Sequence, residues 1–335
     1  MELELNTICV MASLLNLSGR SLVKIPDYSK EYLTFTAVTT CQVKFTGTTA
    51  SGVLNQLQYS TNKGNTWTTL PDDTYIPLAS GDSIILKGSC NPTNNGIGTF
   101  ASSDGTFEVS GNVMSLLYED NYIGRIILTK NFSFGYLFKD CTGITNAGNL
   151  MLLASTLTYG CYYRMFWGCT SLTTAPELPA TTLADCCYTY MFQNCTSLTS
   201  TPALPATTLS VSCYNGMFRG CTSLISIPDE LPVTALTQGC YSEMFRGCTS
   251  LTKAPILPAT TGEGSCYLLM FYGCSSLNYI KCLLTNIPAN ATLNWVFNVS
   301  SSGTFVKAAN MNDWTRDISG IPTNWTVEDY VEETN

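Results

Sequence analysis

The hydrophobic residues in the middle of the chain recur in a fixed order. In the first complete copy they stand at positions i, i+1, i+4, i+5 and i+8, and Gly168 lies just before the last of them. This spacing is typical of the buried face of a short helix, and a glycine favours the left-handed exit at a helix end. These hydrophobic residues are Cys161, Tyr162, Met165, Phe166 and Cys169.

The stretch SLTTAPELP that follows this predicted helix indicates a short extended segment. Leu172, Ala175 and Leu178 are its expected inward residues, while Pro176 and Pro179 forbid a helix there. One unit is therefore expected to consist of a strand, a loop and a helix.

The unit is repeated along the chain. Its Met-Phe dipeptides begin at 165, 191, 217, 244 and 270, and Leu137, Phe138 and Cys141 form a degenerate copy that precedes them. A period in the twenties indicates a solenoid, in which each copy buries its apolar face against the next one. The sequence thus predicts an α/β solenoid with repeats of about 26 residues.

Residues 31–116 have a different pattern, with short alternating runs such as YLTFTAV and SIILKGS between Gly, Pro, Asn and Asp. This pattern predicts a small all-β domain, a sandwich. Within it, STNKGNTW resembles the Asp-box hairpin of sialidases and many other β proteins, with Asn62 where the aspartate usually stands. We interpret it as a turn stabiliser rather than as a sign of glycosidase activity.

The chain is expected to end in a cap. Val296–Val299 and Thr304–Val306 indicate a hairpin over Ser300–Gly303. The expected regions are an N-terminal anchoring segment at 1–30, the β-sandwich domain at 31–116, a connector and N-cap at 117–136, the solenoid at 137–289 and the C-terminal cap at 290–335.

Composition excludes several functional classes. Charged residues make up 12% of the chain, the net charge is -8, and there is no histidine. An acidic chain is a poor partner for nucleic acid. Without histidine, the commonest general base and the histidine zinc sites are excluded.

Of the sixteen cysteines, the eleven at fixed places in the repeat are expected to be structural. Two cysteines stand eight residues apart in each full copy, which on a helix is ~12 Å, too far for a disulfide. With no C-x2-C pair and no histidine, a metal site is not expected either. The sequence predicts a buried thiol ladder of Cys161, Cys169, Cys187, Cys195, Cys213, Cys221, Cys240, Cys248, Cys266 and Cys274.

The repeat, with the consensus MFxGCTSLTxAPxLPATTL, resembles the BspA-like branch of the leucine-rich repeats, found in surface proteins of gut anaerobic bacteria and in their bacteriophages. The flanking segments LQYSTNKGNTW, GNVMSLLY, GTFVKAANM and GIPTNWTV are similar to segments that accompany those repeats, so the resemblance covers 31–335. It implies a leucine-rich-repeat solenoid used for adhesion or protein interaction, with no catalytic residue and no cofactor.

Core positions barely change between copies, whereas two outward columns vary. These two columns either bind a partner or are simply exposed to solvent. The predicted strand-side column is Thr174, Ser200, Ser226, Lys253 and Tyr279, and the predicted helix-side column is Trp167, Gln193, Arg219, Arg246 and Tyr272.

The function expected is that of a non-enzymatic structural or adhesive protein, a phage virion component (fibre, decoration or tail). Its partners would be a protein or a cell-surface glycan, with a homo-oligomer also open. The alternatives are a bacterial cell-surface adhesin, an intracellular scaffold and a carbohydrate-active enzyme with two carboxylates. The carboxylates considered are Glu177, Asp229, Glu230, Glu243 and Glu263, among which no pair recurs.

The N-terminal segment bears on location. Glu2 and Glu4 precede the apolar run TICVMASLLNL, where a signal peptide would carry Lys or Arg. No stretch is long enough for a membrane span. We therefore expect a virion protein made in the host cytoplasm, with residues 1–30 docking on other virion proteins. The alternative is that this segment packs on the sandwich of its own chain.

Overall fold

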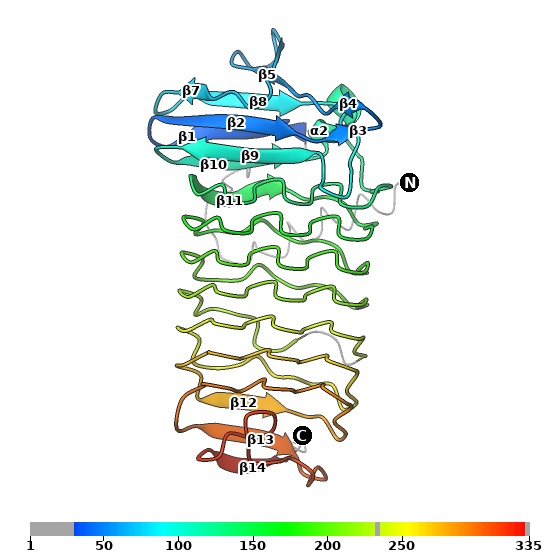
Figure 1. Cartoon of the computed structure of the whole chain (residues 1–335), viewed down its shortest axis with the longest axis vertical. Helices are drawn as coiled ribbons and strands as arrows, with labels where there is room; N and C mark the ends of the chain where they lie inside the picture. The colour runs from blue at the N-terminus through cyan, green and yellow to red at the C-terminus, as the bar shows by residue number, and fades with distance from the viewer. Residues whose placement is uncertain (1–29, 232–234, 332–335) are drawn as a thin grey trace, which may run out of the picture.

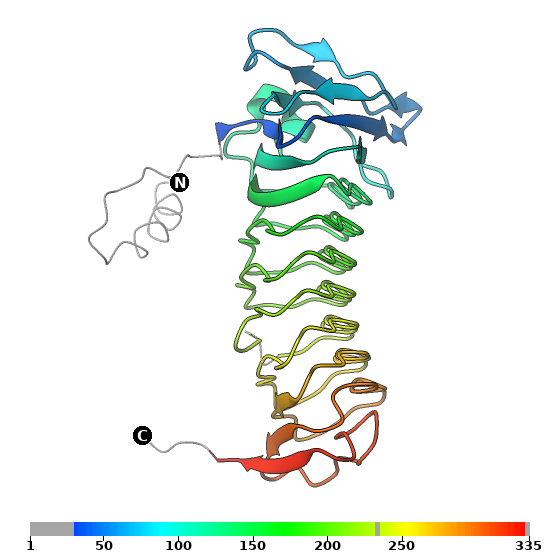
Figure 2. The ribbon, with the colours of Figure 1, turned by 90° about the vertical axis from the view of Figure 1, so that its left-hand side faces the viewer.

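The computed structural model describes residues 30–231 and 235–331. A sheet-rich domain lies at one end of an elongated stack of similar layers, and a small parallel sheet lies at the other end (Figures 1 and 2).

The N-terminal domain contains two main sheets and a short hairpin. The larger sheet consists, in pairing order, of β11 (Ile144–Met151), β10 (Phe107–Asn112), β1 (Leu33–Ala37), β8 (Ser83–Lys87), β5 (Gln58–Ser60) and β6 (Thr68–Thr69). The smaller sheet consists of β7 (Ile76–Leu78), β2 (Cys41–Gly47) and β9 (Gly98–Ser103), and the hairpin of β3 (Thr49–Ala50) and β4 (Val53–Leu54).

Alternation in the sequence explains how the two sheets meet. In β1 every second side chain is buried, as expected for a strand with one face in a core. The ring of Phe35 from β1 lies 4.8 Å from that of Phe100 in β9, and Phe100 also contacts Phe45 of β2. These sheets are consistent with the β-sandwich that the alternating runs predict.

The domain joins the stack through its own sheet. After β10 the chain forms α2 (Ser115–Tyr118) and the 3-10 helix η2 (Glu119–Asn121), and later returns as β11, parallel to β10. The hydroxyl of Ser115 accepts from the Leu33 amide and donates to the Leu86 carbonyl, which fixes this corner.

The prediction of an α/β solenoid is wrong. Strand accounts for 26% of the structure and helix for 3%, and α2 is the one α-helix within the described residues. Where the sequence predicts a helix, each copy has a ribbon of consecutive turns. Every fourth residue of the ribbon has a positive φ, as in Gly160, Arg164 and Gly168, with φ values of 59°, 52° and 76°.

The backbone hydrogen bonds explain why a ribbon replaces the helix. The Tyr163 amide donates to the Gly160 carbonyl at 2.9 Å, which closes a turn within the copy. The next amide, that of Arg164, donates to the Thr189 carbonyl of the following copy at 3.0 Å. Alternate amides thus bond within a copy and between copies. Together with the positive φ at every fourth residue, this gives the ribbon a repeat of four residues rather than the 3.6 of a helix.

On the side of each copy opposite the turn ribbon, fewer backbone contacts connect it to the next copy. Successive copies meet there at isolated parallel bridges, among them Ser200–Ser226 and Lys253–Tyr279. The prolines of the repeat, such as Pro176 and Pro179, cannot donate to a ladder. The predicted strand is therefore reduced to single bridges over most of the stack.

The C-terminal part extends the stack instead of folding as a hairpin. β13 (Thr304–Ala308) lies between β12 (Tyr279–Cys282) and β14 (Thr326–Tyr330) and is parallel to both. Residues 290–298 form another turn ribbon, whose Trp295 carbonyl accepts from the Phe271 amide. The predicted hairpin of Val296–Val299 with Thr304–Val306 is therefore wrong.

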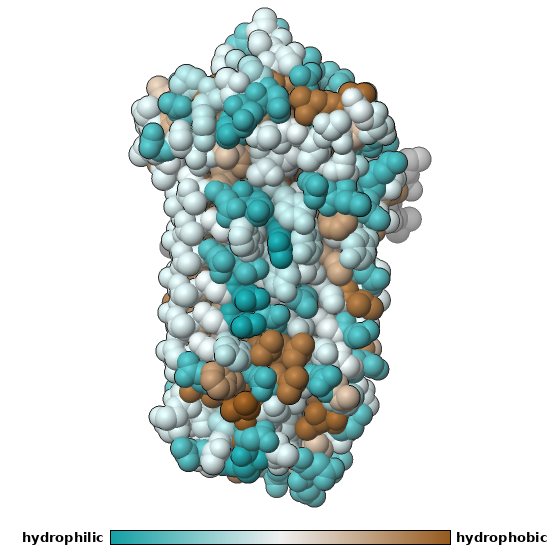
Figure 3. All heavy atoms as spheres, in the orientation of Figure 1, coloured by the Kyte–Doolittle hydropathy of each residue, from teal (hydrophilic) through white to brown (hydrophobic). Residues whose placement is uncertain are grey.

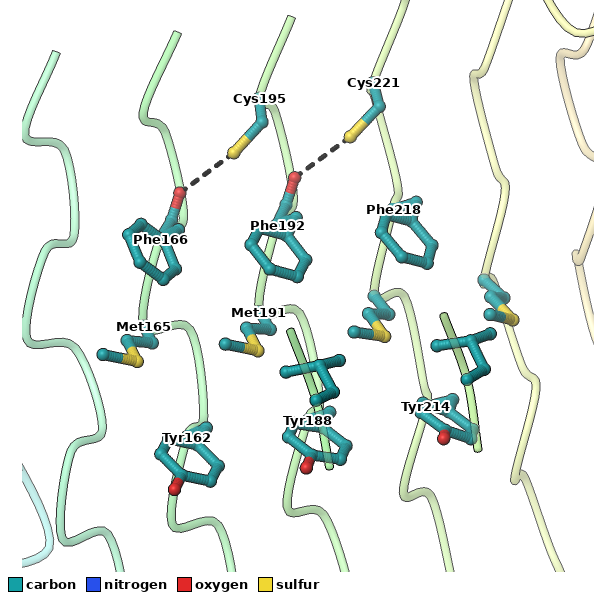
Figure 4. Packing of buried hydrophobic residues seen from close by; sticks show 14 of the residues in the cluster. Tyr162, Met165, Phe166, Tyr188, Met191, Phe192, Cys195, Tyr214, Phe218 and Cys221 are labelled. Atoms are coloured by element: carbon teal, nitrogen blue, oxygen red, sulfur yellow. Dashed lines mark hydrogen bonds between the residues drawn. The ribbon is translucent and has the colours of Figure 1, made fainter. Parts of the chain in front are cut away.

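The core of the stack consists of columns of identical side chains (Figure 4). The rings of Tyr162 and Tyr188 are 5.6 Å apart and nearly parallel, and those of Phe192 and Phe218 are 5.7 Å apart at 4°. Trp295 contacts the last ring of both columns. One layer is thus copied along the stack, and an indole ends it.

Candidate binding surface on the turn ribbons

The thiol ladder lies inside the stack. All ten of its cysteines are buried, and the second cysteine of each copy donates to a phenylalanine carbonyl of the copy before. The Cys195 thiol lies 3.2 Å from the Phe166 carbonyl oxygen, and Cys221 repeats the contact with Phe192 at 3.1 Å (Figure 4). This hydrogen bond gives the carbonyl a second donor besides its own turn amide.

Burial also suppresses thiol chemistry. It raises the pKa of Cys221 and of Cys274 to about 12, so both remain protonated at neutral pH. Within the described residues, no three or more Cys, Asp or Glu side chains are grouped as a metal site would require. The ladder is therefore placed to pack and to link copies.

The residues of the predicted strand-side column have short or exposed side chains. Thr174, Ser200, Ser226 and Lys253 are exposed, and Tyr279 is half-buried. The ammonium of Lys253 lies 5.5 Å from the Tyr279 ring centre. The remaining members offer little more than hydroxyl groups.

The predicted helix-side column lies on the turn ribbons, and we call it the turn-face column: Trp167, Gln193, Arg219, Arg246 and Tyr272. All five are half-buried and share one position in their copies. The amide that follows each member donates to the carbonyl of the next member; the Gly220 amide, for example, donates to the Arg246 carbonyl at 2.8 Å. The column is therefore in register from layer to layer.

The C-terminal members of this column, Arg219, Arg246 and Tyr272, are linked through their side chains. Glu243, from the same ribbon as Arg246, accepts from Arg219 at 2.7 Å and from Arg246 at 2.9 Å. The Arg246 guanidinium lies 4.7 Å from the Tyr272 ring centre, and Tyr272 stacks on Phe297 at 4.7 Å. Two cations here share one carboxylate.

The N-terminal end of the column, at Trp167, lies beside charged residues that the sequence pattern did not identify. Lys139 lies 4.9 Å from the Trp167 ring, and Arg164 lies 5.1 Å from the ring of Tyr163 and 5.2 Å from that of Tyr190. Arg164 and Tyr190 each stand directly before a Met-Phe pair, so the repeat places them at one position in neighbouring copies. The predicted helix-side column took only the residue after that pair.

The face that carries the ribbons is divided by hydropathy (Figure 3). Hydrophilic side chains follow its middle, and hydrophobic ones gather below them toward the C-terminal end. Leu293, Phe297 and Ile318 are exposed in the C-terminal layers.

Asn62 accepts from the Ser60 hydroxyl and from the Thr66 amide, within the turn between β5 and β6. Of the five carboxylates considered, Glu243 is paired with the two arginines, and the other four are exposed: Glu177, Asp229, Glu230 and Glu263.

The proposed anchoring segment lies outside the described residues, apart from Lys30 at its end. Within the part that is described, no helix has the length and apolar character needed to cross a membrane. Comparison with family models, with curated proteins and with solved structures gave no match to this chain.

Proposed function

We propose that this chain is a non-enzymatic adhesive or structural protein that binds its partner through the turn-face column. The observation that carries the proposal is the contrast within each layer. Inside, the Met-Phe pair is the same in five copies; outside, the residue after it is Trp, Gln, Arg, Arg or Tyr in turn. Packing requires the former to stay fixed, and recognition accounts for the variety of the latter.

The residue types support binding by this face. Trp, Tyr and Arg are enriched at the centres of protein interfaces, and the column holds two arginines, a tryptophan and a tyrosine. Their half-burial and mutual contacts limit their freedom before a partner arrives. A surface ordered in advance loses less conformational entropy on binding.

We further propose that the protein is part of a phage virion, as a fibre, decoration or tail component, with a bacterial cell-surface adhesin as the alternative. This rests on the resemblance of the repeat to BspA-like proteins. Residues 1–30 are proposed to attach it to other virion proteins, because TICVMASLLNL is apolar enough to dock in a groove or along a strand edge.

The test of the column uses labelled protein and a panel of gut anaerobic bacteria. A variant with Arg219→Ala, Arg246→Ala and Glu243→Gln removes both cations without leaving the carboxylate unpaired. We expect loss of cell binding, with the free energy of unfolding changed by only ~0.5 kcal/mol per site. Ser200→Ala with Ser226→Ala is the matched control from the other column. Unchanged binding by both variants would reduce both columns to plain surface.

The test of attachment is deletion of residues 2–25. We expect the shortened protein to fold and to be missing from purified particles, as judged by immunoblot. Incorporation of the shortened protein, or its failure to fold, would contradict the anchor.

A further inference from the structure

Five aromatic residues form a connected cluster beside the upper end of the turn-face column. The Phe132 ring contacts Tyr159 at 5.4 Å and Tyr163 at 5.9 Å, and Tyr163 contacts Tyr136 at 5.3 Å and Tyr190 at 6.3 Å. We call these five rings the aromatic platform. Tyr159 is 45% exposed, and the other four are half-buried, so the platform is part of the surface.

Glycines of the next layer allow the rings to lie against the backbone. A Cβ at Gly160 would come within 2.7 Å of the Phe132 ring, and one at Gly216 would overlap the Tyr190 ring. Both glycines have a positive φ, which side chains rarely adopt. The rings are thus held close to the ribbon.

Arg164 is a cation without a counter-ion on this platform. Its guanidinium lies 5.1 Å from the Tyr163 ring, 5.2 Å from Tyr190 and 5.9 Å from Trp167. Within the described part of the chain no hydrogen bond or ion pair joins the Arg164 side chain to another residue, and its buried Nε has no acceptor. This differs from Arg219 and Arg246, which are both paired with Glu243.

Such a group selects a particular ligand chemistry. A guanidinium donates two parallel hydrogen bonds to a carboxylate, and aromatic rings favour a flat apolar surface such as the C–H face of a pyranose. Arg219 and Arg246, which share a single carboxylate, continue the positive charge into later layers of the same face. A linear polymer with regularly spaced acidic groups matches a face whose layers repeat.

We propose that Arg164 and the aromatic platform form a subsite for a uronic-acid residue of an acidic polysaccharide. The sugar ring packs on the platform, and its carboxylate receives hydrogen bonds from Arg164. This inference rests on the proposed function, since it names the ligand class of the same binding face.

The experiment measures the binding of full-length protein to three polyuronates: polygalacturonate, alginate and hyaluronate. Dextran and fully methyl-esterified polygalacturonate are the neutral controls. We expect binding to at least one polyuronate, weakening with salt, and none to the neutral polymers. Arg164→Asn should weaken binding about tenfold, the equivalent of about 1.4 kcal/mol. Asn is suited to this position because Asn294 occupies it in the last ribbon, with φ 53°.

The matched control is Lys63→Asn. Lys63 is exposed on the β domain and has φ 57°, so the substitution removes one charge from the same backbone conformation. We expect binding within twofold of the unmodified protein, with both variants showing unchanged circular dichroism.

Two results would overturn the proposal: no binding of the unmodified protein to any of the three polyuronates, or equal binding by Arg164→Asn. Cell binding that is abolished by protease treatment of the cells would assign a protein partner, and would leave the proposed adhesive function standing. Conversely, normal cell binding by the variant without Arg219 and Arg246 would contradict the proposed role of those residues. Polyuronate binding that depends on Arg164 would still support the subsite.

Discussion

The β domain and the stack use the same kinds of side chain in opposite ways. In the β domain, Phe35 packs edge-on against Phe100 at 73°, and each ring has different neighbours. In the stack, Phe245 and Phe271 lie at 2° to one another, and each inner phenylalanine ring has a phenylalanine above and below it. The geometry of the ring contacts therefore differs from pair to pair in the domain, whereas the stack repeats one geometry.

The backbone shows the same difference. In the domain, β1 pairs with β8 and β10 in continuous antiparallel ladders of four residue pairs each. In a ribbon, half of the amides bond within the copy and the other half bond to the next copy. A layer of the stack is therefore incomplete without its neighbour, and a local defect affects two interfaces.

Alkaline pH is expected to distinguish the regions most strongly. Burial raises the pKa of Cys213, Cys221, Cys240 and Cys274 from 9.0 to about 12. Above pH 9 the unfolded chain releases these protons and the folded one keeps them. Their stabilising contribution is thus intact below pH 9 and is lost as the pH rises toward 12, by ~1 kcal/mol per thiol between pH 9 and 10.

Urea denaturation at pH 7 to 10 checks this expectation. The control is Cys221→Ala, which should lower the stability at neutral pH but flatten its loss at alkaline pH by one thiol's share. A free energy of unfolding that stays constant up to pH 10 would contradict it.

A cavity in the middle of the stack is expected to have the next largest effect. Phe218 is fully buried between Phe192 and Phe245. Phe218→Ala should lower the free energy of unfolding by ~3 to 5 kcal/mol. Ile225→Ala is the control from the same copy, because Ile225 is 66% exposed; its effect should stay within ~0.5 kcal/mol. Equal effects of both, measured by urea denaturation, would show that the ring columns do not hold the stack.

Two glycines, one in each region, are expected to show the smallest difference between the regions. Gly81 of the β domain and Gly216 of the stack both have positive φ, but a Cβ at Gly81 meets nothing within 4 Å. Gly81→Ala should cost ~1 kcal/mol from backbone strain alone. Gly216→Ala should cost ~2 to 3 kcal/mol, because the Tyr190 ring must also move. Thermal unfolding measures both, and equal costs would mean that Tyr190 does not pack on Gly216.

The regions also differ in how far the sequence predicts them. β2 shows the ordinary alternation of buried and exposed residues, so its type could be predicted from period two alone. The expected inward residues from Cys161 to Cys169 are buried, whereas Ala175 is only half-buried. The spacing from Cys161 to Cys169 fits both a helix face and a four-residue turn. Gly216, which stands in the middle of the predicted helix of its copy and has a positive φ, was the signal that favoured turns.

Part of the surface could not have been predicted in this way. Tyr190 and Leu269 have positive φ although neither residue type favours it. The neighbouring layers impose this conformation through their hydrogen bonds, which no local pattern records. Arg164 and Tyr190 occupy the same position of the repeat, but the contact between their side chains depends on how the ribbons lie against one another.

Trp295 has a consequence for how such a chain changes length. Its indole contacts the ends of both the tyrosine and the phenylalanine columns, and Trp314 stacks on its other side at 5.6 Å. A duplicated copy placed before it would meet the neighbours that every inner copy already has. The stack can therefore grow by whole layers without new packing, each adding one outward position for selection to vary while both ends stay as they are.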